Sequence, residues 1–222
     1  MAGRGVRPRV FQPEPGFIKT DNMRFLATTI LLWLLACGLA WAQGDAARGQ
    51  QKAQVCIACH GADGNSTNPE WPKIAGQSAQ YIYRHLQFFR DGQRVNPLMN
   101  PLVTGMSDAD LHDLAAFYES MKVSPGAADK DLVEAGRTIY QGGNPETGVA
   151  ACIACHGPRG NGNPAAVFPK LSHQHALYTA NRLRNYRDGA YSYPGVEIMN
   201  SVSAALSDEE IEAVASYIQG LH

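Results

Sequence analysis

The sequence contains the same series of motifs twice, and this repeat constrains the fold more than any other feature. The hexapeptide CIACHG at Cys56–Gly61 recurs at Cys152–Gly157, 96 residues later. An internal repeat of this kind predicts two homologous domains, which we place at residues 43–124 and 125–222. Further matches follow in the same order: Trp71-Pro72-Lys73-Ile74 with Phe168-Pro169-Lys170-Leu171, Gln77 with Gln174, Tyr81 with Tyr178, Phe89-Arg90-Asp91-Gly92 with Tyr186-Arg187-Asp188-Gly189, Met99 with Met199, and Ser107-Asp108 with Ser207-Asp208.

Each domain is predicted to be helical, with three main helices. The first begins near Asp45 or Asp131 and is expected to run into the cysteine motif, and the second begins near Ser78. The third begins at Ser107 or Ser207, where a serine precedes acidic residues as in a capping box. No segment shows a convincing strand alternation, so we expect an all-α fold. A domain this short buries a modest core, and a large apolar cofactor at its centre would supply much of what is missing.

The pentapeptide Cys-x-x-Cys-His is the attachment signature of c-type haem. Two thiols at this spacing reach the two vinyl groups on one edge of a porphyrin, and the following histidine then lies under the iron. Two alternatives remain: a zinc site made by the two cysteine pairs, and a thioredoxin-like redox pair. Both leave the two histidines unexplained. We therefore predict two haem c groups, attached through Cys56, Cys59, Cys152 and Cys155 and ligated by His60 and His156.

The second axial ligand of each iron should recur at matching positions in both repeats. No histidine outside the two motifs does so, whereas Met99 matches Met199. A thioether is a soft ligand that favours reduced iron, and His/Met ligation raises the reduction potential. Met106 and Met121 compete with Met99, but they fall opposite leucines. We therefore predict Met99 and Met199 as the ligands, and we expect Met99 in a loop before the last helix of its domain.

A ligating histidine commonly donates its other ring N–H to a carbonyl or carboxylate. The backbone carbonyls of Pro72 and Pro169, 12 and 13 residues after their histidines, are the predicted acceptors. The alternative is that each is simply a loop proline. Four aromatic residues are candidates to pack against a haem, or equally to be ordinary core residues: Trp71, Phe168, Phe89 and Tyr186.

Residues 1–42 are predicted to be an upstream extension followed by a signal peptide, with Met23 as the expected true start. An arginine precedes the apolar run Phe25–Leu35, and the sequence ending at Ala42 has the small-x-small pattern of a cleavage site. Two alternatives remain, a retained membrane anchor and lipidation at Cys37.

The charge distribution argues against nucleic acid as a partner. After residue 42 the chain has 14 Lys and Arg against 18 Asp and Glu, which leaves a net charge of -4 (14 minus 18). Binding to nucleic acid depends on neutralising phosphates with a basic surface, and no basic stripe is present.

Taken together, the two CIACH motifs, the x-Pro-Lys-x segments, the Arg-Asp-Gly helix ends and the late methionines resemble the dihaem cytochrome c4 family over residues 44–222. The resemblance implies two class I cytochrome c domains that pack face to face, with the haems near the interface. It also implies a periplasmic or membrane-associated carrier between a quinol-oxidising complex and a terminal oxidase, and we expect a monomer. The family's axial ligands correspond to His60 with Met99 and to His156 with Met199.

An electron carrier is therefore the leading interpretation, with redox proteins, and in particular membrane-bound respiratory complexes, as partners. A cytochrome subunit of a dehydrogenase complex is one alternative. A dihaem redox enzyme, such as a thiosulfate dehydrogenase or a peroxidase, is another. A cysteine-ligated catalytic haem is excluded, because residues 43–222 contain no cysteine beyond the four in the motifs.

Overall fold

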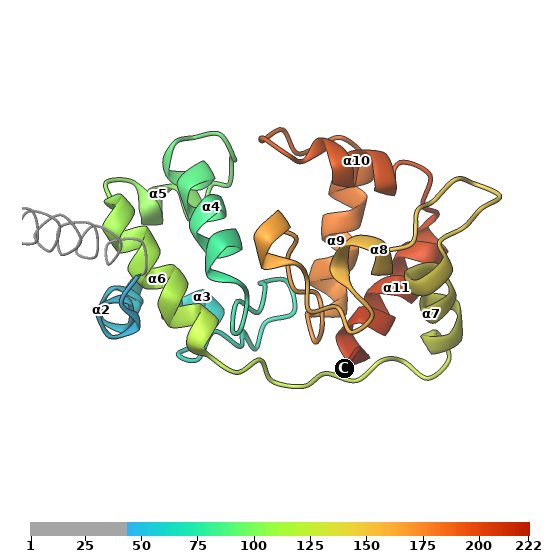
Figure 1. Cartoon of the computed structure of the whole chain (residues 1–222), viewed down its shortest axis with the longest axis horizontal. Helices are drawn as coiled ribbons and strands as arrows, with labels where there is room; N and C mark the ends of the chain where they lie inside the picture. The colour runs from blue at the N-terminus through green and yellow to red at the C-terminus, as the bar shows by residue number, and fades with distance from the viewer. Residues whose placement is uncertain (1–43) are drawn as a thin grey trace, which may run out of the picture. The chain divides into compact units, whose positions relative to one another are not determined.

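Helices make up the regular structure of the computed structural model, which describes residues 44–222 (Figure 1). Within these residues the β contacts are two isolated bridges, Asn144 with Val149 and Asn163 with Phe168, so the all-α prediction is confirmed. The first repeat contains α2 (Ala46–Lys52), α3 (Gln54–His60), α4 (Ala79–Arg90), α5 (Met99–Val103) and α6 (Asp108–Ser120). The second contains α7 (Val133–Gly142), α8 (Ile153–His156), η2 (Pro164–Ala166), α9 (Ala176–Arg187), α10 (Glu197–Ser203) and α11 (Asp208–Gly220).

Polar side chains at the N-caps fix where four of the described α-helices begin. The Asp45 carboxylate accepts from two backbone N–H groups in the first turn of α2, and the Ser78 hydroxyl accepts from the Tyr81 N–H. Ser107 and Ser207 form the two expected capping boxes, at α6 and α11. These contacts satisfy N–H groups that have no partner inside the helix, which is why local sequence predicted these starts.

The first helix of the second repeat differs from the prediction. It ends at Gly142 and does not continue into the cysteine motif. Gly143 adopts a φ of 68°, a left-handed conformation that glycine tolerates and that stops the helix. The following loop, which includes Pro145, leads to the short helix α8.

The Met99 segment also differs from the prediction, because it is helical, as is the matching segment around Met199. Met99 is the first residue of α5, and Met199 lies within α10. Pro101 is compatible with α5 because it occupies the first turn, where a backbone N–H has no helical partner in any case.

A glycine allows the first and last helices of each repeat to cross closely. A Cβ on Gly49 of α2 would lie 2.0 Å from the Asp113 carbonyl oxygen of α6. A Cβ on Gly136 of α7 would lie 2.1 Å from the Ala213 carbonyl oxygen of α11. Both distances are far below van der Waals contact, so only glycine permits these crossings.

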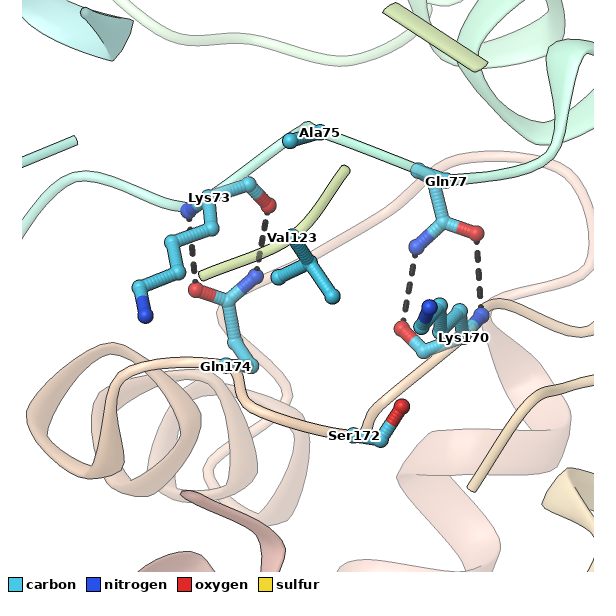
Figure 2. Close-up of a pocket in the computed structure, with 7 residues that line it drawn as sticks. All are labelled: Lys73, Ala75, Gln77, Val123, Lys170, Ser172 and Gln174. Carbon is cyan, nitrogen blue, oxygen red and sulfur yellow. Dashed lines mark hydrogen bonds between the residues drawn. The ribbon is translucent and has the colours of Figure 1, made fainter. Parts of the chain in front are cut away.

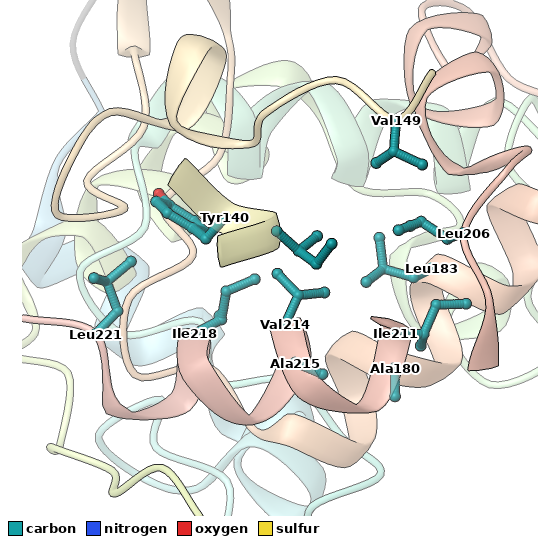
Figure 3. Close-up of a cluster of buried hydrophobic side chains, with 11 residues drawn as sticks. Tyr140, Val149, Ala180, Leu183, Leu206, Ile211, Val214, Ala215, Ile218 and Leu221 are labelled. Atoms are coloured by element: carbon teal, nitrogen blue, oxygen red, sulfur yellow. The ribbon is translucent and has the colours of Figure 1, made fainter. Parts of the chain in front are cut away.

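The apolar core of the second repeat lies between α7, α9 and α11, with side chains of α11 directed into it (Figure 3). Cys152 and Met199 are partly buried against this cluster. In the first repeat the smaller cluster around Leu114 and Tyr118 contacts Cys56 in the same way. The cysteine motifs therefore border the two cores. The cluster in Figure 3 comprises Ile139, Tyr140, Val149, Ala180, Leu183, Leu206, Ile211, Val214, Ala215, Ile218 and Leu221.

The described residues belong to a single compact unit. Residues 121–132 connect α6 to α7 without helix, and the predicted join between residues 124 and 125 falls in this segment; the exact boundary stays a prediction. The predictions for residues 1–42, including Met23 and Cys37, lie outside the described residues.

Candidate functional site

The two motif histidines occupy equivalent places in the two repeats. His60 is the last residue of α3 and His156 the last of α8. The two residues are 8% and 6% exposed. The His60 Nδ1–H donates to the Pro72 carbonyl oxygen, and the His156 Nδ1–H to that of Pro169, both over 2.9 Å. The structure thus contains both hydrogen bonds expected from the sequence. With Nδ1 engaged, Nε2 of each ring is the nitrogen left for an iron.

The protonation state of these rings suits metal binding. Burial lowers the pKa of both His60 and His156, and the hydrogen bond to the proline carbonyl offsets only part of this effect. Both imidazoles are therefore neutral near pH 7, and the neutral ring is the form that ligates a metal.

The cysteines lie one helical turn apart, beside their histidine. Cys56 and Cys59 are three residues apart on α3, so both lie on one helix face. Burial raises the pKa of Cys56, and it raises the pKa of Cys152 to about 11. Reactive thiols in thioredoxin-like motifs have a lowered pKa, so these surroundings do not match that alternative.

The zinc alternative also lacks the required geometry. Within residues 44–222, no three side chains of His, Cys, Asp or Glu gather closely enough to hold a metal ion. Structural zinc requires four such ligands in a tetrahedron, and the two cysteine pairs do not form one.

Three methionines, the ligand candidate Met199 among them, pack on the core clusters of their repeats. Met199 is partly buried against the same core cluster as Cys152. Met106 and Met121 pack on the core cluster of the first repeat, and Leu206, opposite Met106, is 6% exposed in the second. The position that Met106 occupies is therefore a core position in both repeats.

The aromatic candidates fall into two groups. The Phe168 ring lies 6.2 Å from that of His156, so it borders the second histidine. Trp71 is half-buried at the matching position, whereas Phe89 is buried beneath the Arg94 guanidinium. Tyr186 belongs to a cluster between the repeats, described next.

A group of tyrosines and arginines between the repeats is a feature that sequence reasoning missed. The Arg182 guanidinium donates to the Tyr186 and Tyr193 hydroxyls and lies 3.7 Å from the centre of the Tyr191 ring. Arg94 of the first repeat lies 5.2 Å from the Tyr193 ring. The sequence signal for this group is the concentration of tyrosine and arginine in residues 178–193.

The described residues fit a haem in each repeat. On α10, Asn200 Oδ1 and Ser203 Oγ are buried without a hydrogen-bond partner among the described residues, close in sequence to Met199. Imidazole nitrogen, thioether sulfur and two thiols per repeat complete the donor set.

Comparison with known proteins agrees with this geometry. The sequence profile of the family described as cytochrome c matches residues 46–122 and again residues 133–222. Cytochrome c4 of Pseudomonas aeruginosa is 47% identical over 201 residues, which cover 90% of this chain and 100% of that protein. This chain belongs to the cytochrome c4 family. It is a dihaem electron-transfer protein with two haem c groups, a carrier rather than an enzyme, and its partners are redox proteins.

Two further relatives of this cytochrome c4 chain bear on its fold and partners. The crystal structure of reduced cytochrome c4 from Pseudomonas stutzeri superposes with a TM-score of 0.78 at 45% identity, over 81% of this chain and 100% of that one. A thiosulfate dehydrogenase electron acceptor from Stutzerimonas stutzeri is 34% identical over 188 residues, 79% of this chain and 87% of that protein. Among residues 44–222, no helix has the length and apolar character needed to cross a bilayer.

Proposed function

We propose that His60 and Met99 ligate the iron of one haem, and that His156 and Met199 ligate the iron of the other. Cys56 and Cys59, and Cys152 and Cys155, form the thioether bonds to the two haems. The supporting observation is that both repeats carry the same donor set at matched positions. In each, the histidine is buried and held at Nδ1 by a proline carbonyl.

The bound haem supplies an iron that accepts and releases one electron, and the chain tunes this exchange. The proline carbonyls orient the imidazoles and make them stronger ligands. The thioether sulfurs of Met99 and Met199 favour reduced iron. The burial of His60 and His156 would limit the access of water to an iron bound at Nε2. An iron held by a histidine and a methionine would have no open position for a substrate.

Substitution of the methionines tests this ligation. Met99→His and Met199→His should each lower the reduction potential of one haem and abolish its iron–sulfur charge-transfer band. Met106→Leu is the matched control, because leucine already occupies the equivalent position in the second repeat. The assignment in the first repeat is wrong if Met106→Leu removes the band and Met99→Leu does not.

We further propose that the chain is exported to the periplasm and cleaved after Ala42. The support is the apolar run and the small-x-small pattern in the sequence. Mass spectrometry of the purified protein should show an N-terminus at Gln43 and two haems that survive denaturation. A diacylglycerol-modified Cys37 at the N-terminus would establish lipidation instead, and an intact apolar segment would establish a retained anchor.

The proposed partners are membrane-bound respiratory complexes, with electrons passing from a quinol-oxidising complex to a terminal oxidase. The support is the relationship to cytochrome c4 over the whole described chain. Transient redox encounters use small interfaces, and charge pairs at their rims make association sensitive to salt. Stopped-flow mixing with each purified complex should show fast electron exchange that slows as ionic strength rises.

A second candidate partner is a thiosulfate-oxidising dehydrogenase. The support is the relative named as the electron acceptor of such an enzyme, although its identity is 34% against 47% for the cytochrome c4 relative. The two candidates separate in one assay. If the oxidised protein is reduced much faster by a dehydrogenase with thiosulfate than by a quinol-oxidising complex with quinol, the second partner is the correct one.

A further inference from the structure

Two glutamines cross between the repeats and bind the backbone of the opposite repeat (Figure 2). The Gln174 Oε1 accepts from the Lys73 N–H over 2.9 Å, and its Nε2 donates to the Lys73 carbonyl over 2.8 Å. The Gln77 amide makes the same pair of hydrogen bonds to Lys170, both over 2.9 Å. Each glutamine side chain therefore forms hydrogen bonds with both the backbone N–H and the backbone carbonyl of one lysine.

Lys73 and Lys170 directly follow the prolines whose carbonyls accept hydrogen bonds from the two histidines. The Lys73 N–H and the Pro72 carbonyl belong to one peptide group. Its oxygen accepts from the His60 Nδ1–H, while its N–H donates to Gln174. A single conjugated peptide thus joins a histidine of the first repeat to a glutamine of the second.

The arrangement is reciprocal. The peptide between Pro169 and Lys170 accepts from the His156 Nδ1–H and donates to Gln77 of the first repeat. Each histidine is therefore connected, through two hydrogen bonds and one peptide group, to a side chain of the other repeat.

The amide orientation follows from the same contacts. Each Oε1 also accepts from the next backbone N–H, that of Ser78 for Gln77 and that of His175 for Gln174. Each Oε1 accepts from two N–H groups, and each Nε2 donates to a carbonyl. A flipped amide would place its NH₂ group against the two N–H donors and its oxygen against the carbonyl. The acceptor is thus held against the peptide N–H.

We propose that Gln174 and Gln77 are positioning residues that each tune the haem of the opposite repeat. An acceptor on a peptide N–H polarises the peptide and makes its carbonyl a stronger acceptor. A stronger acceptor forms a stronger hydrogen bond with the Nδ1–H of the histidine, and this raises the basicity of the ring. A more basic ring stabilises oxidised iron and lowers the potential. The proposal rests on His60 and His156 being the iron ligands.

Removal of one glutamine should therefore raise the potential of the haem in the other repeat. Cooperative strengthening is worth about 10–30% of the full strength that a hydrogen bond has in an apolar interior. The redox equilibrium should therefore shift by roughly three- to tenfold towards the reduced form. For a one-electron couple this corresponds to about 30–60 mV.

The experiment is a redox titration of the full dihaem protein, with each haem followed by its assigned methyl resonances in the NMR spectrum. Gln174→Met should shift the haem attached at Cys56 and Cys59, and Gln77→Met the other one. Gln174→Asn, whose side chain is one methylene shorter, should act in the same direction if the methionine variant folds poorly.

A matched control separates tuning from a loosened interface. The His175 Nε2–H donates across the same interface to the Ser66 carbonyl over 2.7 Å, and this side chain makes no hydrogen bond to either Pro–Lys peptide. His175→Phe should leave both potentials within about twofold of the parent equilibrium, well below the effect expected from peptide polarisation.

The possible outcomes are distinct. An unchanged potential in a folded Gln174 variant, a shift confined to the haem of its own repeat, or an equal shift with His175→Phe would each overturn the proposal. Absence of the His/Met charge-transfer band in the parent protein would instead overturn the ligation on which the proposal depends.

Discussion

Replacing Gly136 by alanine tests how closely α7 and α11 pack. The new Cβ would lie 2.1 Å from the Ala213 carbonyl oxygen and 2.6 Å from the Tyr217 Cβ. Ordinary contact begins at 3.4 Å, so the helices must separate by 1.3 Å (3.4 minus 2.1). The first obstacle is backbone, so it cannot be relieved by a rotamer change. Separation would also loosen the core behind the crossing, and the cost should be ~3 kcal/mol.

Thermal unfolding of the purified dihaem protein, followed by far-ultraviolet circular dichroism, measures this cost. If residues 44–222 unfold as one unit, the midpoint should fall by roughly 6–12 °C. If the second repeat unfolds alone, its own transition should fall further, while that of the first repeat stays in place.

Gly142→Ala is the matched control for this experiment. Gly142 is the last residue of the same helix, and a Cβ there meets nothing within 4 Å. Alanine is the better helix former, so this variant should be unchanged or more stable by up to ~1 kcal/mol. The reasoning fails if Gly136→Ala unfolds within a degree or so of the parent, or if both variants lose stability equally.

Other variants test other parts of the structure. Asp113→Ala should destabilise the first repeat by ~2 kcal/mol, since the buried carboxylate accepts from the Asp45 N–H and from Arg48; an unchanged urea midpoint would contradict this. Hydrogen bonds from Lys52 and its own capping box lower the pKa of Asp110 to about 2. Because the folded-state pKa of Asp110 is depressed, the stabilisation from this carboxylate is present above about pH 4 and is lost towards pH 2. Asp110→Asn should therefore lose less stability than the parent on acidification through this range. Urea midpoints that fall as steeply in the variant as in the parent would refute this prediction. The reduced protein should bind carbon monoxide slowly or not at all, because the proposed histidine and methionine ligands would fill both axial positions of each iron. Stoichiometric binding with sustained turnover of thiosulfate or hydrogen peroxide would contradict the carrier function.

Local chemistry explains why the helix starts were predictable. The caps at Asp45, Ser78, Ser107 and Ser207 act within three residues of their own position, so the pattern appears in the sequence itself. The early end of α7 was missed for a related reason. Equivalence between the repeats favours continuation of this helix into the cysteine motif, whereas the glycines at 142 and 143 favour a stop.

Contacts between the repeats were beyond the reach of sequence patterns. Gln77 and Gln174 stood out only as a matched pair, and nothing local shows that each binds the backbone of the other's repeat. The same holds for Arg94 and Arg182, which are distant in sequence and meet in one aromatic cluster. Such contacts depend on how two folded domains dock, which the order of residues along either domain does not reveal.

The duplication provides an internal comparison that separates shared chemistry from divergence. Three features have the same form in the two repeats: the proposed ligands, the histidine hydrogen bonds to proline carbonyls, and the glutamine hydrogen bonds to the opposite backbone. None of them distinguishes one haem from the other. Other matched positions have diverged. Burial lowers the pKa of His85 well below its usual range, so His85 is neutral, whereas the half-buried Arg182 at the matching position keeps its positive charge. Arg94 lies 3.0 Å from the Nδ1 atom of His85 and brings a second cation into the same cluster, so the two repeats carry this charge at unmatched positions. Any difference between the two potentials should originate at diverged positions of this kind.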